Sequence, residues 1–223
     1  MIFYLLLFIS LGAQAVECVS TQKRDIPFVD IQAREGGRNK KILVIGQVHG
    51  DEEESGILTE AWLMRLQKLS PSNHWRIIPR LNPDGVIQKT RYNANKVDIN
   101  RNFPTKDWDQ SHDDPRRNPG PSAGSEVETK CVIAHIEEFK PDIVVSIHTP
   151  YGLFDFDGPA DKQIHTNLLP WKRLGTFRGS LGRYLWDERN IPVLTIEINP
   201  RTFHKTKYGL TQLQDRITDL LVQ

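Results

Sequence analysis

The stretch "KILVIGQVHGDEEES", residues 41–55, joins a run of apolar residues to a histidine and four consecutive acids. The short apolar run at residues 41–46 is typical of a buried strand. After Gly50, apolar residues recur near helical spacing as far as Leu69. The stretch therefore predicts a strand, a turn that carries His49, and a helix.

The same alternation of strands and helices continues along the chain. Further strands are expected at residues 76–79, 142–148 and 193–198, and helices at residues 125–139 and near the C-terminus. Strands that alternate with helices predict a single α/β domain, in which helices flank a central mixed, largely parallel, twisted sheet.

The segments between these elements give weaker signals. Ser125 and Glu128 have the spacing of a capping box at the start of the helix at residues 125–139. The sequence "NPDG" at residues 82–85 predicts a turn. Residues 104–124 and the mostly polar connection after residue 148 are expected to be loops.

Two histidines are placed where predicted strands end. His49 follows the strand at residues 41–46, and His148 ends the strand at residues 142–148. Because ligands bind beyond the carboxyl ends of strands in such sheets, we expect the two side chains to meet. With Glu52 they supply the three protein ligands of a catalytic zinc ion. The alternative is a structural histidine followed by acids that favour the start of a helix.

A His-x-x-Glu match alone is weak evidence, because the chain contains a second one. His135 and Glu138 have the same spacing, but they lie inside a predicted helix, where we expect a solvated charge pair. The pair at His49 differs because it lies at a turn from strand to helix, where a third ligand can approach.

Two further segments carry polar side chains that could act together with a zinc site. Residues 90–104, "TRYNANKVDINRNFP", contain Arg91, Asn100 and Arg101, which are suited to binding a carboxylate unless they are ordinary surface residues. Glu197 lies among apolar residues of a predicted strand, where an acid is costly unless it is paired or used. It is therefore a candidate general base, with a buried salt bridge as the alternative.

The segments "HGDE", "NPDG", "TRYNANKVDINRNFP", "SIH" and "LTIEI", in this order, resemble the M14 zinc metallocarboxypeptidases, and most of all their murein peptide amidase branch. The resemblance covers about residues 38–220, and "VDINRNFP" after "NPDG" is its most specific part. It implies a zinc carboxypeptidase-like fold and an exo-acting zinc peptidase or amidase. The implied roles are zinc ligands His49, Glu52 and His148, general base Glu197, carbonyl-polarising Arg91, and carboxylate-binding Asn100 and Arg101.

The resemblance also suggests a substrate. The interval from His148 to Glu197 is short for the digestive carboxypeptidases, and we assign no substrate-binding tyrosine. The murein peptide branch cleaves the γ-D-glutamyl bond to meso-diaminopimelate, so a small cell-wall peptide is implied. Its distal ammonium group would meet Asp155 or Asp157, unless these are ordinary loop acids. A zinc deacylase of N-acyl amino acids, of the aspartoacylase or succinylglutamate desuccinylase type, and a non-catalytic binding module on the same fold are the alternatives.

The N-terminus predicts export. Residues 1–15, "MIFYLLLFISLGAQA", have no charge and end in Ala-Gln-Ala, which is typical of a cleaved signal peptide, although the absence of Lys or Arg leaves an uncleaved anchor as the alternative. We therefore expect a signal peptide at residues 1–15, an N-terminal extension at 16–37 and a catalytic domain at 38–223. The protein would be periplasmic or secreted, without stable membrane insertion after cleavage.

Cysteines and charge give the remaining expectations. In an oxidising compartment Cys18 and Cys131 either form a disulfide or remain two unpaired thiols. The net charge is +1, with 29 basic and 28 acidic residues interspersed, so no nucleic-acid partner is expected. The sequence does not indicate an oligomeric state.

Overall fold

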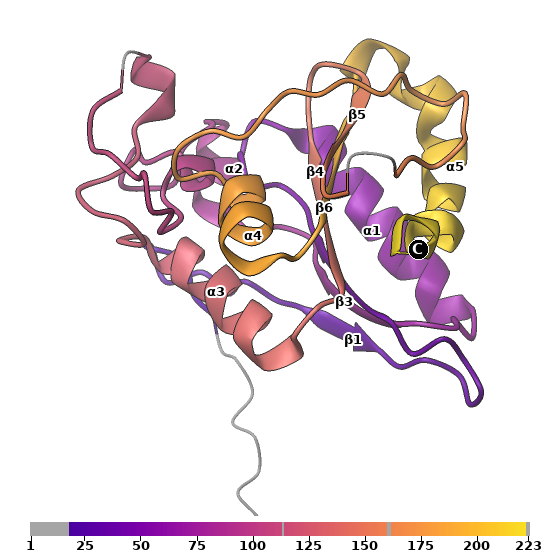
Figure 1. The fold of residues 1–223 in the computed structure, drawn as a ribbon. Helices are drawn as coiled ribbons and strands as arrows, with labels where there is room; N and C mark the ends of the chain where they lie inside the picture. The colour runs from indigo at the N-terminus through magenta and orange to yellow at the C-terminus, as the bar shows by residue number, and fades with distance from the viewer. Residues whose placement is uncertain (1–17, 113, 160–161, 222–223) are drawn as a thin grey trace, which may run out of the picture.

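The computed structural model of the chain describes residues 18–112, 114–159 and 162–221. Its centre is a six-stranded sheet with the order β1-β3-β2-β4-β6-β5 (Figure 1). The strands are β1 (Val29–Ile31), β2 (Lys41–Ile45), β3 (His74–Ile78), β4 (Ile143–His148), β5 (Leu153–Asp157) and β6 (Val193–Glu197). The four inner strands run parallel, and β1 and β5 pair antiparallel at the edges. The predicted mixed, largely parallel α/β sheet is confirmed.

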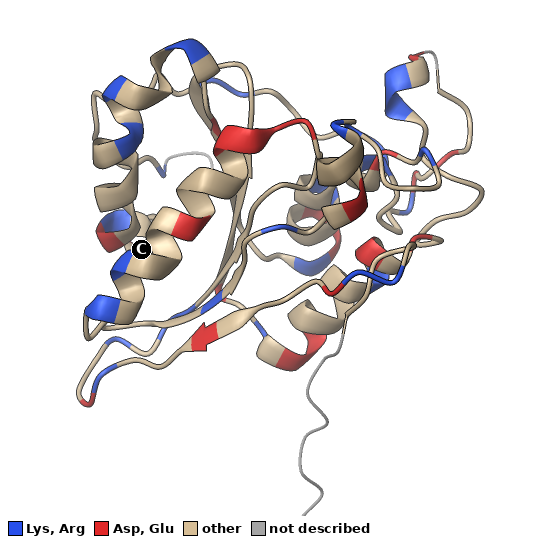
Figure 2. Ribbon diagram, turned by 180° about the vertical axis from the view of Figure 1, so that it is seen from behind, with Lys and Arg blue, Asp and Glu red and all other residues tan. Residues whose placement is uncertain are grey.

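Helices cover both faces of this sheet. The α-helices are α1 (Glu53–Lys68), α2 (Pro83–Gln88), α3 (Val127–Phe139), α4 (Leu181–Arg189) and α5 (Phe203–Leu213). The 3₁₀ helices are η1 (Ile99–Arg101), η2 (Pro115–Arg117), η3 (Pro200–Thr202) and η4 (Gln214–Leu221). In Figure 1, α1 and α5 lie on one side of the sheet and α3 and α4 on the other. Acidic and basic residues are interspersed along these elements (Figure 2).

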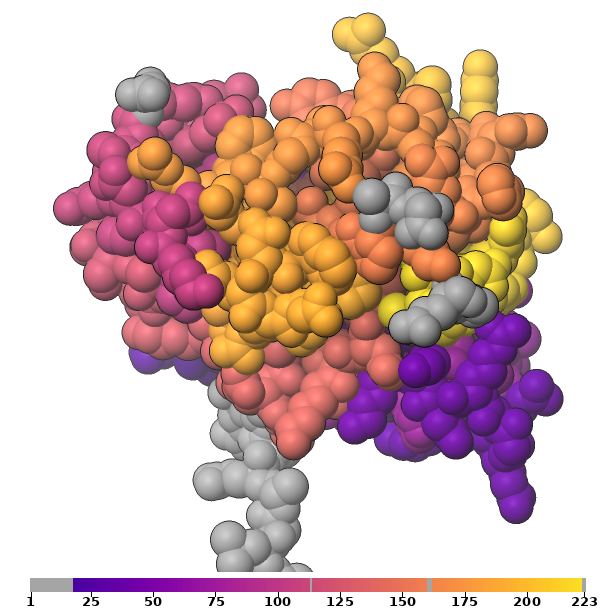
Figure 3. All heavy atoms as spheres, in the orientation of Figure 1, coloured from indigo at the N-terminus to yellow at the C-terminus, as the bar shows by residue number. Residues whose placement is uncertain are grey.

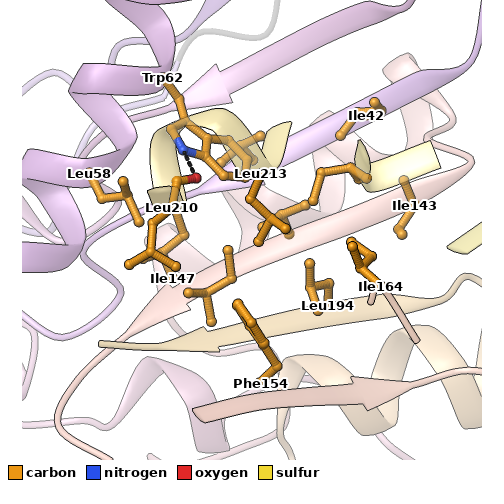
Figure 4. Packing of buried hydrophobic residues seen from close by; sticks show 14 of the residues in the cluster. Ile42, Leu58, Trp62, Ile143, Ile147, Phe154, Ile164, Leu194, Leu210 and Leu213 are labelled. Atoms are coloured by element: carbon orange, nitrogen blue, oxygen red, sulfur yellow. Dashed lines mark hydrogen bonds between the residues drawn. The ribbon is translucent and has the colours of Figure 1, made fainter. Parts of the chain in front are cut away.

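The inner strands are buried on both faces, as expected for parallel strands covered by helices. Along β2, Ile42 and Val44 belong to the core beneath α1 and α5, whereas Leu43 belongs to the core beneath α3 and α4. Trp62 of α1 is fully buried in the first core, and its indole Nε1 donates to the carbonyl of Leu210 in α5 at 3.0 Å (Figure 4). The two cores hold the sheet rigidly and leave its carboxyl-terminal edge for a site.

Several local predictions were wrong. The connection after residue 148 contains β5 and α4 and is not a continuous loop. The segment "NPDG" begins α2, in which the Asn82 side chain caps the helix by accepting from the Gly85 N–H at 2.9 Å. Helix α3 begins at Val127 without the expected capping box. Glu128 accepts instead from the Thr21 N–H and from Asn93 Nδ2, both at 3.0 Å. Donors from distant segments therefore take the place of the backbone N–H that a capping box would use.

The N-terminal segment is attached to the body of the fold. Cys18 forms a disulfide with Cys131 of α3, which settles the choice between bridge and free thiols. Ser20 Oγ donates to Asp84 Oδ1 in α2 at 2.8 Å, and Asp84 is fully buried. The segment from residue 18 onward also supplies β1 to the sheet. It is therefore part of the domain that was predicted to begin at residue 38. The predicted signal peptide lies outside the described residues.

In the loop at residues 104–124, the short η2 is the only helix among the described residues, which include no strand there, as predicted. It lies against residues 172–180, and the two segments form adjacent parts of the surface in Figure 3. The Phe103 N–H donates to the Gly179 carbonyl at 2.9 Å, and the Gly179 N–H donates to Thr105 Oγ1 at 3.0 Å. None of the helices in the described ranges is long and apolar enough to cross a membrane.

Candidate active site

A pocket of about 360 Å³ opens at the carboxyl ends of β2, β4 and β6. His148 ends β4, and Glu197 lies beside it at the end of β6. His49 and Glu52 lie in the turn between β2 and α1. The parallel arrangement of these strands therefore brings together side chains that are far apart in the sequence.

His49, Glu52 and His148 form a buried cluster in this pocket. Oε1 of Glu52 lies 2.7 Å from Nδ1 of His49, and its Oε2 lies 3.0 Å from Nδ1 of His148. One ligand atom from each residue lies within 4.8 Å of the others. Two imidazole nitrogens and one carboxylate are a typical ligand set for a catalytic zinc ion, so the donor chemistry fits zinc.

The outer nitrogen of each histidine has its own partner. His49 Nε2 donates to Asp98 Oδ1 at 3.1 Å, and His148 Nε2 lies 2.9 Å from Ser146 Oγ. Such contacts select the tautomer and fix the ring, which directs both Nδ1 atoms toward Glu52. Asp98 and Ser146 were not predicted to be functional from the sequence, although Asp98 lies inside the stretch at residues 90–104.

The charges of the cluster shift its pKa values. Burial alone would lower the pKa of His49, but the carboxylates of Glu52 and Asp98 outweigh it and raise that pKa to about 9. Burial would raise the pKa of Glu52, but His49 and His148 together lower it. A bound cation would therefore compete with a proton for this cluster.

Glu197 is 7% exposed and faces the same pocket. Burial raises the pKa of its carboxyl. Its Oε2 accepts a hydrogen bond from the Tyr151 N–H at 3.4 Å, and no cationic side chain of the described residues forms an ion pair with it. The buried salt bridge considered from the sequence is therefore not what accommodates this acid.

Arg91 is held rigidly beside the cluster. Its Nε and Nη2 donate to Asp98 Oδ2 at 3.0 and 2.8 Å, and its Nη1 lies 3.2 Å from His49 Nδ1. Burial would lower the pKa of Arg91, but Asp98 and then Glu52 raise it. Its guanidinium is therefore a fixed positive charge next to the cluster.

Asn100 and Arg101 lie in η1 on the wall of the pocket. The Asn100 side-chain oxygen accepts from the Leu181 N–H at 2.9 Å, which turns its amide nitrogen toward other partners. Arg101 Nη1 donates to the Asn100 carbonyl, and its buried Nε has no hydrogen-bond partner among the described residues. Burial lowers the pKa of Arg101, and the nearby Arg91 and Arg117 add to this effect against the opposing charge of Asp98. The wall is thus suited to an anion.

Asp155 and Asp157 lie on β5 and line the same pocket, so they are strand residues and not loop acids. Asp155 is 4% exposed, and its Oδ1 has no hydrogen-bond partner among the described residues. Burial, and then the charges of Asp155 and Asp187, raise the pKa of Asp157 to about 7. Gly182 packs against this acid, because a Cβ there would lie 2.1 Å from Asp157 Oδ2. Asp155 is buried and Asp157 is half-buried, and neither forms an ion pair with a described residue, although the charge of Arg173 lowers both pKa values against the effect of burial. This part of the pocket is therefore suited to a positively charged group.

The sequence pattern of the zinc carboxypeptidases, the M14 peptidases, matches residues 14–154, more than half of the chain. The chain belongs to this zinc carboxypeptidase family. It is therefore a metallocarboxypeptidase-type hydrolase, and the family resemblance seen in the sequence is confirmed.

Relatives within and around this family were also found. The chain is 31% identical to murein peptide amidase A from Vibrio campbellii over 179 residues, which cover 73% of this chain and 71% of the relative. It is 34% identical to murein peptide amidase A from Escherichia coli K12 over 125 residues, 51% of this chain and 50% of the relative. The solved murein-tripeptide amidase from Escherichia coli O157 has a TM-score of 0.70 and 24% identity and covers 89% of this chain and 90% of its own. A metallo-carboxypeptidase from Burkholderia cenocepacia has a TM-score of 0.62 and 16% identity, covering 92% and 64%.

The zinc carboxypeptidase fold also explains the second His-x-x-Glu match. His135 is fully buried, so the expected solvated charge pair is wrong. Its Nδ1 lies 3.3 Å from Arg76 Nη1, and Glu138 pairs with Arg76 instead of with the histidine. Burial and Arg76 lower the pKa of His135 to about 4. Cys18 and Cys131 lie nearby, but their sulfurs are joined and do not provide thiolate ligands.

The two tyrosines of the interval after His148 lie in different environments. Tyr151 is 64% exposed at the pocket, whereas Tyr184 is buried and stacks on Phe103. Phe177, which the sequence analysis did not single out, also lines the pocket. Its ring lies over Arg101, a contact between segments 76 residues apart that has no local signal in the sequence.

Proposed function

We propose that this protein is an exo-acting amidase that hydrolyses the γ-D-glutamyl–meso-diaminopimelate bond of a murein peptide with one zinc ion. The observation that carries the proposal is the division of one pocket into an anion-binding wall and an acidic floor. Asn100 and Arg101 form the wall, and the unpartnered Asp155 Oδ1 lies at the floor beside Asp157. Relatives named murein peptide amidase A support this choice of substrate.

The leaving residue fits this division of charge. Diaminopimelate carries a terminal carboxylate and, at its far end, an ammonium group. Arg101 and Asn100 bind the terminal carboxylate with charge-assisted hydrogen bonds, which restricts cleavage to a chain end. Asp155 and Asp157 receive the distal ammonium group, which supplies a hydrogen-bond partner for the unpartnered Oδ1 of Asp155.

The catalytic residues have separate roles. His49, Glu52 and His148 would hold the zinc ion, which when bound would supply a Lewis acid for the scissile carbonyl and lower the pKa of water. Glu197 takes a proton from the attacking water and returns it to the leaving amine. Arg91, fixed by Asp98, donates a hydrogen bond to the carbonyl oxygen as negative charge develops on it.

The proposed place of action is outside the cytoplasm, in the periplasm or the medium, after removal of residues 1–15. The apolar, uncharged N-terminus supports export, and the Cys18–Cys131 disulfide is a bond typical of oxidising compartments. N-terminal sequencing of the protein from culture fractions tests both points, and a first residue other than Val16 would contradict the cleavage site.

The test of the activity uses zinc-loaded protein and three substrates: L-Ala-γ-D-Glu-meso-diaminopimelate, an α-linked peptide with the same leaving residue, and an N-acyl amino acid. We expect cleavage of the first, read by mass spectrometry, and its loss with a chelator. Glu197→Gln should keep zinc and lose activity by about 10²–10⁴-fold, the typical contribution of general acid–base catalysis.

Glu52→Gln should lose zinc, whereas Glu53→Gln is the matched control, because Glu53 is an exposed acid in the first turn of α1. Cleavage of the N-acyl amino acid alone would indicate a deacylase instead. Absence of any chelator-sensitive cleavage would indicate a binding module.

A further inference from the structure

The ring of Phe177 is in contact with two guanidinium groups at the pocket. Cζ of Arg101 lies 4.7 Å from the ring centroid, and Cζ of Arg117 lies 4.8 Å from it. The two positive charges are therefore closer together than one Debye length, about 10 Å at 0.1 M ionic strength. The π electrons of the ring attract each guanidinium group, but the two positive charges repel each other. A negative group bound near both would remove this repulsion.

Arg117 reaches the pocket from the loop at residues 104–124. It lies in η2 and lines the same pocket as Arg101 and His148. Its Nε lies 3.5 Å from Asp114 Oδ2, in an exposed pair that uses one of the five N–H donors of the guanidinium. The other donors have no partner among the described residues, and a planar guanidinium suits a carboxylate.

The proposed function already assigns Arg101 and Asn100 to the terminal carboxylate of the leaving residue. That residue is part of a substrate with further carboxylates. The γ linkage leaves the α-carboxylate of glutamate free, and diaminopimelate has another carboxylate at its distal centre. An ordinary peptide ending in a neutral residue has neither.

We infer that Arg117 is a second carboxylate-binding residue of this pocket, and that it makes the enzyme prefer substrates with two or more carboxylates. The inference rests on the proposed function and names a specificity that Asn100 and Arg101 alone do not provide. The stacking of Phe177 with Arg101 and Arg117 holds the two anion-binding positions at a fixed separation.

The experiment compares wild type, Arg117→Ala and Arg117→Lys on four substrates. These are L-Ala-γ-D-Glu-meso-diaminopimelate, its analogue with lysine as leaving residue, L-Ala-4-aminobutanoyl-diaminopimelate, and L-Ala-4-aminobutanoyl-lysine, which keeps only the terminal carboxylate. For the tripeptide we expect Arg117→Ala to lower kcat/KM about tenfold, the effect of one partly exposed charged hydrogen bond. For L-Ala-4-aminobutanoyl-lysine we expect no change beyond about twofold. Arg117→Lys should restore part of the preference, since it keeps the charge without the planar fork.

The two single-deletion substrates identify the carboxylate that Arg117 binds, because the substrate that lacks it becomes insensitive to Arg117→Ala. Arg178→Ala is the matched control, since Arg178 is an exposed arginine one residue after Phe177 and pairs with Asp109 of the same loop at 3.1 Å. An equal loss on all four substrates in Arg117→Ala would overturn the inference, because it would mean that Arg117 merely supports Phe177 and Arg101.

Direct binding separates this inference from the proposed function. Isothermal titration calorimetry measures the Kd of the zinc-loaded protein for the tripeptide, in the Glu197→Gln background if the wild type cleaves it. Absence of hydrolysis in the wild type would contradict the proposed function alone. A Kd about tenfold weaker in Arg117→Ala would still support the second carboxylate site, and an unchanged Kd would refute it.

Discussion

Replacing Asp98 by Asn tests whether one buried carboxylate orients both the metal-binding histidine and the arginine beside it. Oδ1 accepts from His49 Nε2 at 3.1 Å and from the Asn100 N–H at 3.0 Å, and Oδ2 accepts from two nitrogens of Arg91. Asparagine has the same shape, but its NH₂ end is a donor. Whichever of the two oxygen positions the NH₂ group occupies, it faces N–H donors, which then have no acceptor. If His49 changed tautomer to relieve the conflict, its Nδ1 would carry the proton and would not bind metal.

The expected magnitude follows from the two kinds of bond that Asp98 makes. Loss of a carboxylate behind a metal-binding histidine typically weakens metal binding by about 10–100-fold. Loss of a charged hydrogen bond costs about 1.5–3 kcal/mol, and the bonds to Arg91 are of this kind. At saturating zinc we therefore expect a further fall in kcat/KM of about 10–100-fold, since about 1.4 kcal/mol corresponds to a factor of ten.

The assay has two parts. Competition with a chromophoric chelator gives the Kd for zinc, and hydrolysis of the tripeptide at saturating zinc gives kcat/KM. Asp109→Asn is the control, because Asp109 is an exposed acid that pairs with Arg178. Circular dichroism checks that the variant is folded. Wild-type values of both the zinc Kd and kcat/KM in folded Asp98→Asn would refute the assignment.

Three other predictions follow from the fold and the pocket. The double variant Cys18→Ser/Cys131→Ser should lose up to about 4.7 kcal/mol of unfolding free energy in urea, because the bridge closes a loop with a sequence separation of 113, and reductant should destabilise the wild type but not the variant. For a substrate with a distal ammonium group, kcat/KM should rise as the pH passes about 7, since Asp157 has a pKa of about 7 and binds a cation only when ionised; in Asp157→Asn this rise should disappear relative to a substrate without the ammonium group. Gly182→Ala should weaken tripeptide binding and cost about 1–3 kcal/mol of stability, because its Cβ would lie 2.1 Å from Asp157 Oδ2; an unchanged KM would show that the acid can move without loss.

The metal-binding cluster was predictable because it depends on strand ends. A short apolar run followed by His49, and another ending in His148, indicated two strands of one parallel sheet. In the structure β2 and β4 are neighbours and run parallel, so their carboxyl ends lie side by side. The roles of Arg91, Asn100 and Arg101 came from the family resemblance, since arginines in a loop are usually surface residues.

The floor of the pocket was predictable only in part. Residues 154–157 alternate aromatic and acidic side chains over only four positions, which is too short a pattern to distinguish an edge strand from a loop. Once β5 pairs with β6, Phe154 and Phe156 face the core, while Asp155 and Asp157 face the pocket. The function of the two acids therefore depends on the pairing of two strands about 40 residues apart in sequence, as between Asp155 and Thr195. No local signal in the sequence indicates this pairing.

The two His-x-x-Glu matches show why spacing alone does not identify a metal site. In α3 the spacing places His135 and Glu138 near Arg76, whose guanidinium takes the carboxylate and suppresses protonation of the imidazole. At the end of β2 the same spacing places His49 beside a carboxylate whose second oxygen is already directed at His148. The two sites differ in the third group that tertiary packing places beside the histidine and the glutamate: Arg76 in one and His148 in the other. A cation such as Arg76 leaves no room for a metal ion, whereas a second imidazole adds a ligand.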